Sequence, residues 1–341
     1  MFVHQPGART DEVACRSGRY GARRRGPVEG TRRGGRSSAS RCARRSPHGD
    51  DPGPGRLPRR AQERAVQAGA LPLLSGRPLQ DEPAGLSSAP MTTRGVWFSP
   101  DGLSGADVVA FGQRVETLGY ETLWVGETFG RDPFAQLSMI GATTSTLGLA
   151  TGIANIYNRA PGVMLQGANT VAEATGGRMT LGIGVSSPAI VSKVRGIEYG
   201  KPYSFMKTYL EAMGGSRYTS VAPAEPVPVV LAALGPKMLE LAAEKTAGAH
   251  PYNTTPEHTA MARDVMGPDA GLYVEQKVLL TTDVEQARAT GASVLKFYSR
   301  APGYVNAWKR MGFTDDDISG LSDRLVDAVV AWGTADQIEA R

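Results

Sequence analysis

The sequence has few cysteines, few histidines and no long apolar run, and each scarcity excludes a class of protein. Both cysteines, Cys15 and Cys42, lie in the first ninety residues, so residues 91–341 can hold neither a disulfide framework nor a thiolate metal site. The four histidines are isolated and form no HExxH pattern, so we expect no bound metal. No apolar run approaches the roughly 18 residues of a membrane helix, and the N-terminus lacks the apolar part of a signal peptide. We therefore expect a cytoplasmic protein that does not contact a membrane.

Charge is divided unevenly along the 341 residues. Residues 1–90 contain 17 Arg, no Lys and 8 acidic residues, whereas residues 91–341 contain 21 basic and 25 acidic ones. The first segment is rich in Arg, Gly, Pro and Ser without apolar periodicity. We predict that 1–90 is a disordered extension with no folded role and that Met91 is the natural start. Arg clusters attract phosphate, but aromatic stacking partners are nearly absent, so we expect no nucleic-acid partner.

Apolar, strand-like segments alternate with amphipathic helical segments through 91–341. The predicted strands are Gly95–Ser99, Glu121–Val125, Leu147–Ala154, Met179–Val185, Val227–Ala232, Gly248–Pro251 and Tyr273–Leu280. The predicted helices include Ser104–Leu118, Pro133–Ser145, Pro161–Thr175, Pro236–Thr246 and 256–265. Strict alternation predicts a parallel sheet covered by helices, and seven strands at this spacing favour an α/β fold of the (β/α)8 TIM-barrel type.

The eighth strand of such a barrel is not evident. Residues 283–341 read as helical, with breaks near Ala301-Pro302-Gly303 and Gly320, and Ala335–Arg341 reads as a helix. We expect that the barrel domain, 91–341, lacks its last strand and helix. Two unpaired sheet edges would favour, as the alternative to an enzyme, a truncated barrel without catalytic activity.

Small and polar residues follow five of the predicted strands. They are Gly126-Glu127-Thr128, Thr151-Gly152-Ile153-Ala154-Asn155, Gly184-Val185-Ser186-Ser187, Ala232-Ala233-Leu234-Gly235-Pro236-Lys237 and Ala249-His250-Pro251-Tyr252. In a barrel the carboxyl ends of all strands meet on one face, where active sites form. Small residues there leave room for a flat ring to lie against the backbone. These segments therefore predict a site for a ring-shaped cofactor.

One of these segments has the form of an anion site. Gly235-Pro236 opens a helix with Lys237 in its first turn, and the free N–H groups and dipole of a helix N-terminus favour phosphate. An ordinary helix start is the alternative reading. The segment LGIGVSS at 181–187 lacks the third glycine of a dinucleotide fingerprint, so we do not expect a nicotinamide cofactor there.

Four motifs in order give the chain a family resemblance. The segments WVGETFGRDPFAQLS, LATGIANIYNRAPGVML, GRMTLGIGVSSP and VPVVLAALGPKMLELAAEKTAGAHPY resemble the bacterial luciferase-like monooxygenase superfamily, in particular its class that uses the deazaflavin coenzyme F-420. The resemblance covers roughly 94–341. It implies a TIM barrel whose C-terminal mouth holds the deazaflavin, or FMN, and it implies a homodimer acting on a small-molecule substrate.

The resemblance also implies particular site residues. A non-prolyl cis peptide is expected behind the ring at Thr151-Gly152, and Asn155 is expected at the pyrimidine edge. The ring wall would further include Glu127, Gly184, Ser186 and Ser187. The segment Ala232-Ala233-Leu234-Gly235 with Lys237 matches the phosphate-side loop of the family.

Two departures from the family pattern concern the acid/base group. Many deazaflavin members carry an acidic residue followed by His after the second strand, where this chain has Glu127-Thr128, and many carry Glu where this chain has Ser187. Glu127 and His250 are then the predicted catalytic residues, with Tyr252 a further candidate. A strand-end capping role for Glu127 and a structural role for His250 are the alternatives.

Two reactions remain open at this point. The first is hydride transfer between F-420 and a small organic substrate, and the alternative is an FMN-dependent monooxygenase in which reduced flavin reacts with O₂. The loops after the first, fourth and seventh predicted strands show no diagnostic charge cluster, so the substrate is not readable. Trp97, Phe129 and Tyr157 suggest an apolar, partly aromatic pocket.

Overall fold

The computed structural model describes residues 94–341, so the predicted extension 1–90 and the start at Met91 lie outside the described part. The strands are β1 (Gly95–Phe98), β2 (Thr122–Val125), β3 (Gly148–Thr151), β4 (Ala154–Asn155), β5 (Met179–Gly184), β6 (Val229–Leu231), β7 (Gly248–Ala249), β8 (Gly271–Leu272), β9 (Lys277–Leu280) and β10 (Val330–Gly333). The α-helices are α1 (Gly105–Thr117), α2 (Pro133–Gly141), α3 (Pro161–Ala174), α4 (Pro202–Gly214), α5 (Pro236–Lys245), α6 (Pro256–Met266), α7 (Val284–Leu295), α8 (Pro302–Arg310), α9 (Asp315–Gly320), α10 (Asp323–Val329) and α11 (Ala335–Glu339). A π-helix, η2 (Ala189–Val194), and a 3-10 helix, η3 (Tyr298–Arg300), complete them.

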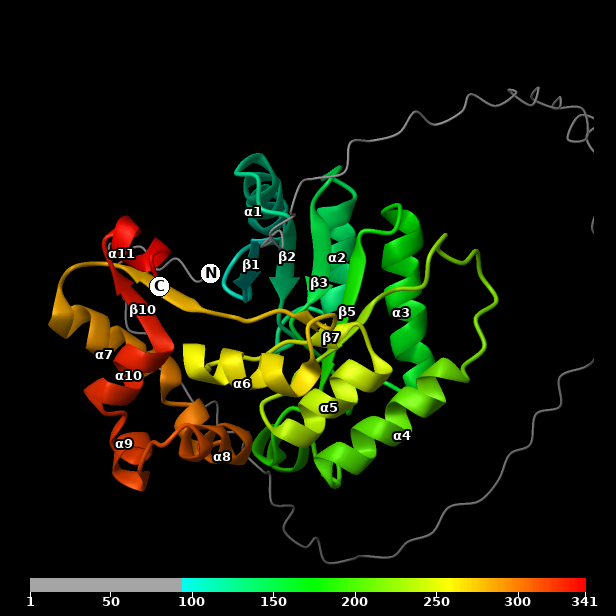
Figure 1. Cartoon of the computed structure of the whole chain (residues 1–341). Coiled ribbons are helices and arrows are strands. Elements are labelled where there is room, and N and C mark those ends of the chain that lie inside the picture. The colour runs from blue at the N-terminus through cyan, green and yellow to red at the C-terminus, as the bar shows by residue number, and fades with distance from the viewer. Residues whose placement is uncertain (1–93) are drawn as a thin grey trace, which may run out of the picture. The chain divides into compact units, whose positions relative to one another are not determined.

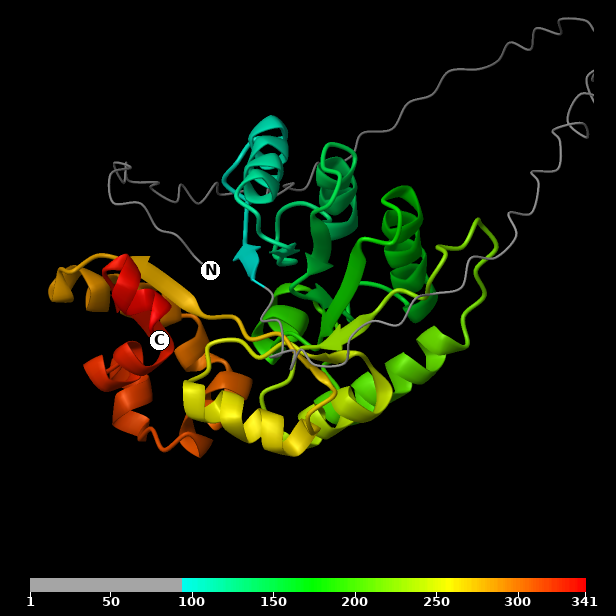
Figure 2. The ribbon, with the colours of Figure 1, turned by 45° about the horizontal axis from the view of Figure 1, so that its top comes forward.

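The main sheet is parallel and curled, as the alternation of strands and helices predicts. Its order is β1-β2-β3-β5-β6-β7-β8, with β4 also paired to β5. Helices α1 to α6 follow one another along the curve, each in contact with the next (Figures 1 and 2). Within residues 94–341, β1 and β8 are the two edges of this sheet and do not pair. The predicted α/β, TIM-barrel-like fold is confirmed, in the form of an open, curled sheet.

The predicted strand Tyr273–Leu280 is wrong as a single element. Its first part stays with the main sheet, because the Tyr273 backbone N–H donates to Ala249 O at 2.8 Å, just after β8. Its last four residues form β9, which pairs in parallel with β10 in a separate two-stranded sheet. An apolar run shows that a strand can form but not which neighbour it takes, so the division was not visible in the sequence.

Strand β10 is a second difference, because 283–341 was predicted to be helical. Its residues continue the apolar run of α10, and a short apolar run fits a buried helix turn and a strand equally well. A strand therefore does follow the long helical region. It pairs with β9, opposite Lys277 to Leu280, and does not close the main sheet.

Local signals explain where the helices of the site begin. The Asp132 carboxylate accepts hydrogen bonds from the Phe134 and Ala135 backbone N–H groups, both at 3.0 Å, and Pro133 occupies the first turn of α2. Helix α3 likewise begins at Pro161, and α5 begins at Pro236 without a side-chain cap. Proline at the first helical position costs no hydrogen bond, since that N–H has no partner inside the helix.

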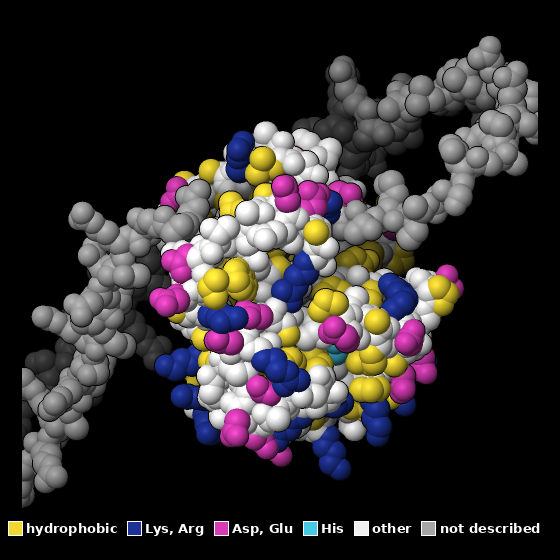
Figure 3. Space-filling model, turned by 60° about the vertical axis from the view of Figure 1, so that its left-hand side comes forward, with side chains coloured by type: hydrophobic (Ala, Val, Ile, Leu, Met, Phe, Trp, Pro, Cys, Tyr) yellow, Lys and Arg dark blue, Asp and Glu magenta, His cyan; other side chains and the backbone are white. Residues whose placement is uncertain are grey.

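The described residues build two large hydrophobic cores and a small third cluster of Trp124, Ala150 and Val230. The larger lies between the main sheet and helices α1 to α6, around side chains such as Leu149, Met164 and Ile183. The smaller is formed by the C-terminal elements around Leu295, Trp308 and Leu325. The face that includes these C-terminal elements exposes Lys and Arg side chains interspersed with Asp and Glu (Figure 3).

Candidate functional site

The carboxyl ends of β4, β5 and β6 lie side by side. Asn155 pairs with Gly184 across β4 and β5, and Ile183 pairs with Leu231 across β5 and β6. A methyl group placed on Gly184 would come within 3.0 Å of the Ala232 Cβ. Three residues predicted for the cofactor ring or its phosphate therefore meet at one place, as convergence in a barrel requires.

The bend between β3 and β4 contains the non-prolyl cis peptide, at Gly152-Ile153. The prediction of Thr151-Gly152 was wrong by one residue. Thr151 still belongs to the ladder of β3, opposite Val125, and its hydroxyl donates to Gly182 O at 2.6 Å, so the bend can begin only after it. The indole N–H of Trp97 donates to Gly152 O at 2.6 Å, and a methyl group on Gly152 would lie 2.7 Å from that nitrogen. A larger residue at position 152 would therefore displace the Trp97 indole.

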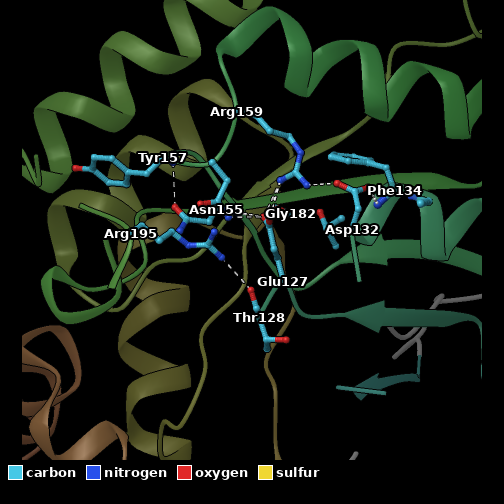
Figure 4. Close-up of polar contacts among 12 residues, drawn as sticks. Glu127, Thr128, Asp132, Phe134, Asn155, Tyr157, Arg159, Gly182 and Arg195 are labelled. Carbon is cyan, nitrogen blue, oxygen red and sulfur yellow. Dashed lines mark hydrogen bonds and ion pairs between the residues drawn. The ribbon is translucent and has the colours of Figure 1, made fainter. Parts of the chain in front are cut away.

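Glu127, two residues after the end of β2, is saturated with hydrogen bonds (Figure 4). Its carboxylate accepts from the Asn155 backbone N–H at 2.7 Å, from Asn158 Nδ2 at 2.8 Å and from Arg159 Nη1, which lies 2.8 Å from both oxygens. The side chains of Glu127 and Arg159 are 8% and 11% exposed. This carboxylate ties the end of β2 to the segment that leaves β4, which fixes the position of Asn155.

Arg159 is held on its other side by the start of α2. Its guanidinium forms an ion pair with the Asp132 cap and lies over the Phe134 ring at 5.1 Å, and Tyr209 Oη of α4 donates to its backbone carbonyl at 2.8 Å. The Asn155 side chain accepts from the Tyr157 backbone N–H at 3.0 Å, so its Oδ1 is engaged, while its Nδ2 has no acceptor among residues 94–341. Asn158 and Arg159 were not among the predicted site residues, because no spacing rule links them to Glu127.

His250 follows β7 and is buried, with 4% exposed. Its Nδ1 lies 2.6 Å from Tyr273 O and its ring stacks on Trp124 with centroids 4.8 Å apart. A carbonyl only accepts hydrogen bonds, so Nδ1 carries the proton and Nε2 keeps a lone pair. That Nε2 is buried without a partner among the described residues. Burial lowers the pKa of His250, against the opposing hydrogen bond to Tyr273, so the ring is neutral at neutral pH.

The loop from β6 into α5 forms a cradle with exposed cations. No side chain caps the N-terminus of α5, and Lys237 is exposed in its first turn. Arg310, at the end of α8, donates to Leu234 O at 3.3 Å and would lie 3.3 Å from a methyl group on Gly235. His258 Nε2 donates to the same carbonyl at 3.0 Å. Arg310 lies 73 positions after Lys237, so only the fold shows that it belongs to this cradle.

The two serines after β5 differ in geometry. Ser186 has a φ of +56°, which is uncommon for a residue with a side chain, and its carbonyl accepts from Tyr199 Oη at 3.5 Å. The Ser187 hydroxyl accepts from the Ile190 backbone N–H at 3.4 Å, at the start of η2. Both are partly exposed at the strand end, next to Gly184.

The aromatic residues predicted to share one pocket have separate partners. Trp97 packs on Tyr252 at 5.2 Å, Phe129 is 65% exposed beneath Arg195, and Tyr157 stacks on Phe205 at 4.5 Å. The described residues contain no group of three or more His, Cys, Asp or Glu placed to hold a metal ion. Among residues 94–341, every helix is too short or too polar to span a lipid bilayer.

Protonation of the buried histidines gives a pH-dependent stability. Burial lowers the pKa values of His250 and His258 in the folded state, whereas an unfolded histidine titrates near 6.5. The unfolded chain therefore binds more protons as pH falls below about 6.5, and the free energy of unfolding should fall by up to about 1.4 kcal/mol per pH unit per histidine. Denaturant titrations between about pH 7 and pH 5 measure this slope, and His250→Gln with His258→Gln should flatten it. An unchanged slope in the double variant would contradict the assignment.

Known proteins are similar to this chain over most of its described residues. The family model described as luciferase-like monooxygenase matches residues 87–341. The chain is 24% identical to a putative coenzyme F420-dependent oxidoreductase of Mycobacterium tuberculosis, covering 72% of this chain and 88% of the relative. It is 27% identical to 5,10-methylenetetrahydromethanopterin reductase of Methanolobus tindarius, covering 69% and 85%.

A solved structure shares the fold. The coenzyme F420-dependent tetrahydromethanopterin reductase from Methanopyrus kandleri superposes with a TM-score of 0.56 at 19% identity, covering 72% of this chain and 87% of that one. Since the family model spans most of the chain and all of the described site, the chain belongs to the luciferase-like monooxygenase family of enzymes.

Proposed function

We propose that the chain is an oxidoreductase that transfers a hydride between the deazaflavin coenzyme F-420 and a small organic substrate. The observation that carries the proposal is the meeting of Asn155, Gly184 and Ala232 at neighbouring strand ends, beside the uncapped start of α5. Relatives named as coenzyme F420-dependent support the choice of cofactor. Action in the cytoplasm, as a homodimer, belongs to the same proposal.

The residues present fit such a cofactor by their chemistry. The backbone of Ala232 to Gly235, with Lys237 and Arg310, would hold a phosphate, because the N-terminal N–H groups of α5 have no side-chain cap, Lys237 lies in its first turn and Arg310 reaches Leu234. Thr151, Gly152, Asn155, Gly184, Ser186 and Ser187 would hold the ring. When bound, a deazaflavin supplies or takes up a hydride at this place.

Glu127 and His250 have different roles in this proposal. Glu127 positions Asn155, because its carboxylate is occupied by donors from the β4 segment and by Arg159. His250 presents a neutral ring whose Nε2 can accept a proton or a hydrogen bond but cannot donate one. His250 is therefore the proposed base, and Glu127 a positioning residue.

Binding of the cofactor is the direct test. Purified protein titrated with F-420 and with FMN should quench F-420 fluorescence at lower concentration than it quenches FMN fluorescence. Preferred binding of FMN would replace the proposal by the flavin-dependent monooxygenase, and binding of neither would remove both.

The phosphate cradle gives a sharper prediction with a control on the same helix. Lys237→Ala removes a cation from the start of α5, and we expect F-420 affinity to fall by about tenfold, the value of one charge-assisted hydrogen bond. Lys245→Ala removes the same charge from the exposed last turn of α5 and should leave the affinity unchanged. Equal losses in the two variants would show a general effect of net charge in place of a phosphate site.

A further inference from the structure

A cleft of about 430 Å³ opens beside the proposed ring site. It is lined by Ser187 and Ala189, which follow β5, and by Lys296, Phe297, Arg300 and Ala301, which follow α7. Its volume lies in the range of small-molecule pockets. Ser187 is also a proposed cofactor residue, so a ligand in the cleft would touch the same strand end as the ring.

The charge of this cleft is of one sign. Lys296 and Arg300 line it, no acidic residue does, and neither cation has an ion pair or a side-chain hydrogen bond among the described residues. This contrasts with residues 91–341 as a whole, where acidic residues outnumber basic ones. Two exposed cations without partners, four positions apart, repel each other, so an anion bound between them would be stabilised by both charges.

The lining offers both polar and apolar contacts. An ammonium and a guanidinium together match a carboxylate or a phosphate, the guanidinium through its two-pronged geometry. Phe297 is 52% exposed at the cleft and offers an apolar face. The Ser187 hydroxyl accepts one hydrogen bond from Ile190 and can still donate one. The cleft therefore suits an organic acid with an apolar part.

The cleft and the phosphate cradle are separate sites, because Arg300 and Arg310 lie at opposite ends of α8. Arg300 precedes α8 and Arg310 is the last residue of that helix, whose nine residues span about 13 Å. Arg310 lies at the cradle of α5, whereas Arg300 lies at the cleft beside Ser187. Residues 300–310 thus supply one cation to the phosphate cradle and another to the cleft.

We propose that this cleft binds the acidic group of the substrate, a carboxylate or a phosphate monoester, and so holds the substrate beside the ring site. The proposal rests on the proposed function, since it takes the ring site to be the cofactor site. It also changes the expectation that no cluster of charges marks the substrate site. Lys296 and Arg300 form such a cluster after α7, and only the fold shows that they share a cleft with Ser187.

Calorimetric titration with inorganic phosphate at low ionic strength, with F-420 saturating, tests the site. The unsubstituted protein should bind phosphate, and Lys296→Ala with Arg300→Ala should weaken that binding by about tenfold or more. The matched control, Lys207→Ala with Arg217→Ala, removes the same two charges from exposed positions outside the cleft and should not change it. F-420 affinity should stay within about twofold in both double variants.

The other outcomes are decisive. Loss of F-420 affinity in the cleft variant, equal to its loss of phosphate affinity, would assign the cleft to the acidic tail of the coenzyme and overturn the substrate proposal. Absence of phosphate binding to the unsubstituted protein, or equal weakening in the control, would overturn the anion site itself. Failure of the unsubstituted protein to bind F-420 would overturn the proposed function, and the assignment to a substrate with it.

Discussion

Arg159→Met should destabilise the protein by about 3 kcal/mol, because it leaves the buried Glu127 carboxylate without its cation. Two donors, the Asn155 N–H and Asn158 Nδ2, remain on that carboxylate, so the loss should lie near the lower end of the range for broken buried ion pairs. Methionine keeps much of the length of the arginine stem, which limits the cavity left behind. Chemical denaturation monitored by tryptophan fluorescence measures the change.

A matched surface pair provides the control for Arg159. Arg94 pairs with Glu339 at 3.3 Å, but the two side chains are 73% and 69% exposed. Solvent screens such a pair, so Arg94→Met should cost less than about 1 kcal/mol. Similar losses in the two variants would mean that burial of the Glu127 pair has no special weight.

Gly182→Ala should cost about 3 kcal/mol, since its new methyl group would overlap a backbone atom. The added Cβ would overlap the carbonyl oxygen of Thr151. Thr151 cannot move aside, because it pairs with Val125 of β2 and its hydroxyl donates to Gly182 O of β5. A side chain can rotate away from a new methyl group, but a paired strand cannot. β3 and β5 would have to separate, and the bend that precedes Asn155 would shift with them.

A helical glycine gives the control for Gly182. Gly214, the last residue of α4, has open space around its would-be Cβ and no positive φ. Gly214→Ala should leave the protein equally stable or stabilise it by up to about 1 kcal/mol, through a lower entropy of the unfolded chain. Thermal or denaturant unfolding compares the two variants, and a neutral Gly182→Ala would contradict the tight contact between β3 and β5.

The alternation of strands and helices up to α6 and the meeting of Asn155, Gly184 and Ala232 at the strand ends were predicted from the sequence. Both follow from local patterns: apolar runs such as Leu147–Ala150 make strands, and parallel strands bring their carboxyl ends together. The position of the bend was missed by one peptide, because only the pairing of Thr151 with Val125 shows where β3 ends.

Contacts between distant segments could not be predicted in this way. Arg310 reaches Leu234 across 76 positions, and Lys296 lines the same cleft as Ser187, which lies far earlier in the sequence. A charged residue in a helical segment is expected to be solvated at the surface unless its neighbours in the folded structure are known. The division of Tyr273–Leu280 between two sheets has the same origin, since the choice of partner strand is a property of the whole fold.

The two large hydrophobic cores support different parts of the proposed site. The strand ends that would hold the cofactor are anchored in the larger core, whereas Lys296 and Arg300 adjoin Leu295 and η3, whose packing belongs to the smaller one. Free-energy effects of substitutions that share no contacts are close to additive. On the proposed assignments, substitutions that repack the smaller core can alter the position of Lys296 and Arg300 with little effect on Asn155 and Gly184, whereas Arg310 of α8 and Ser187 link the two sites.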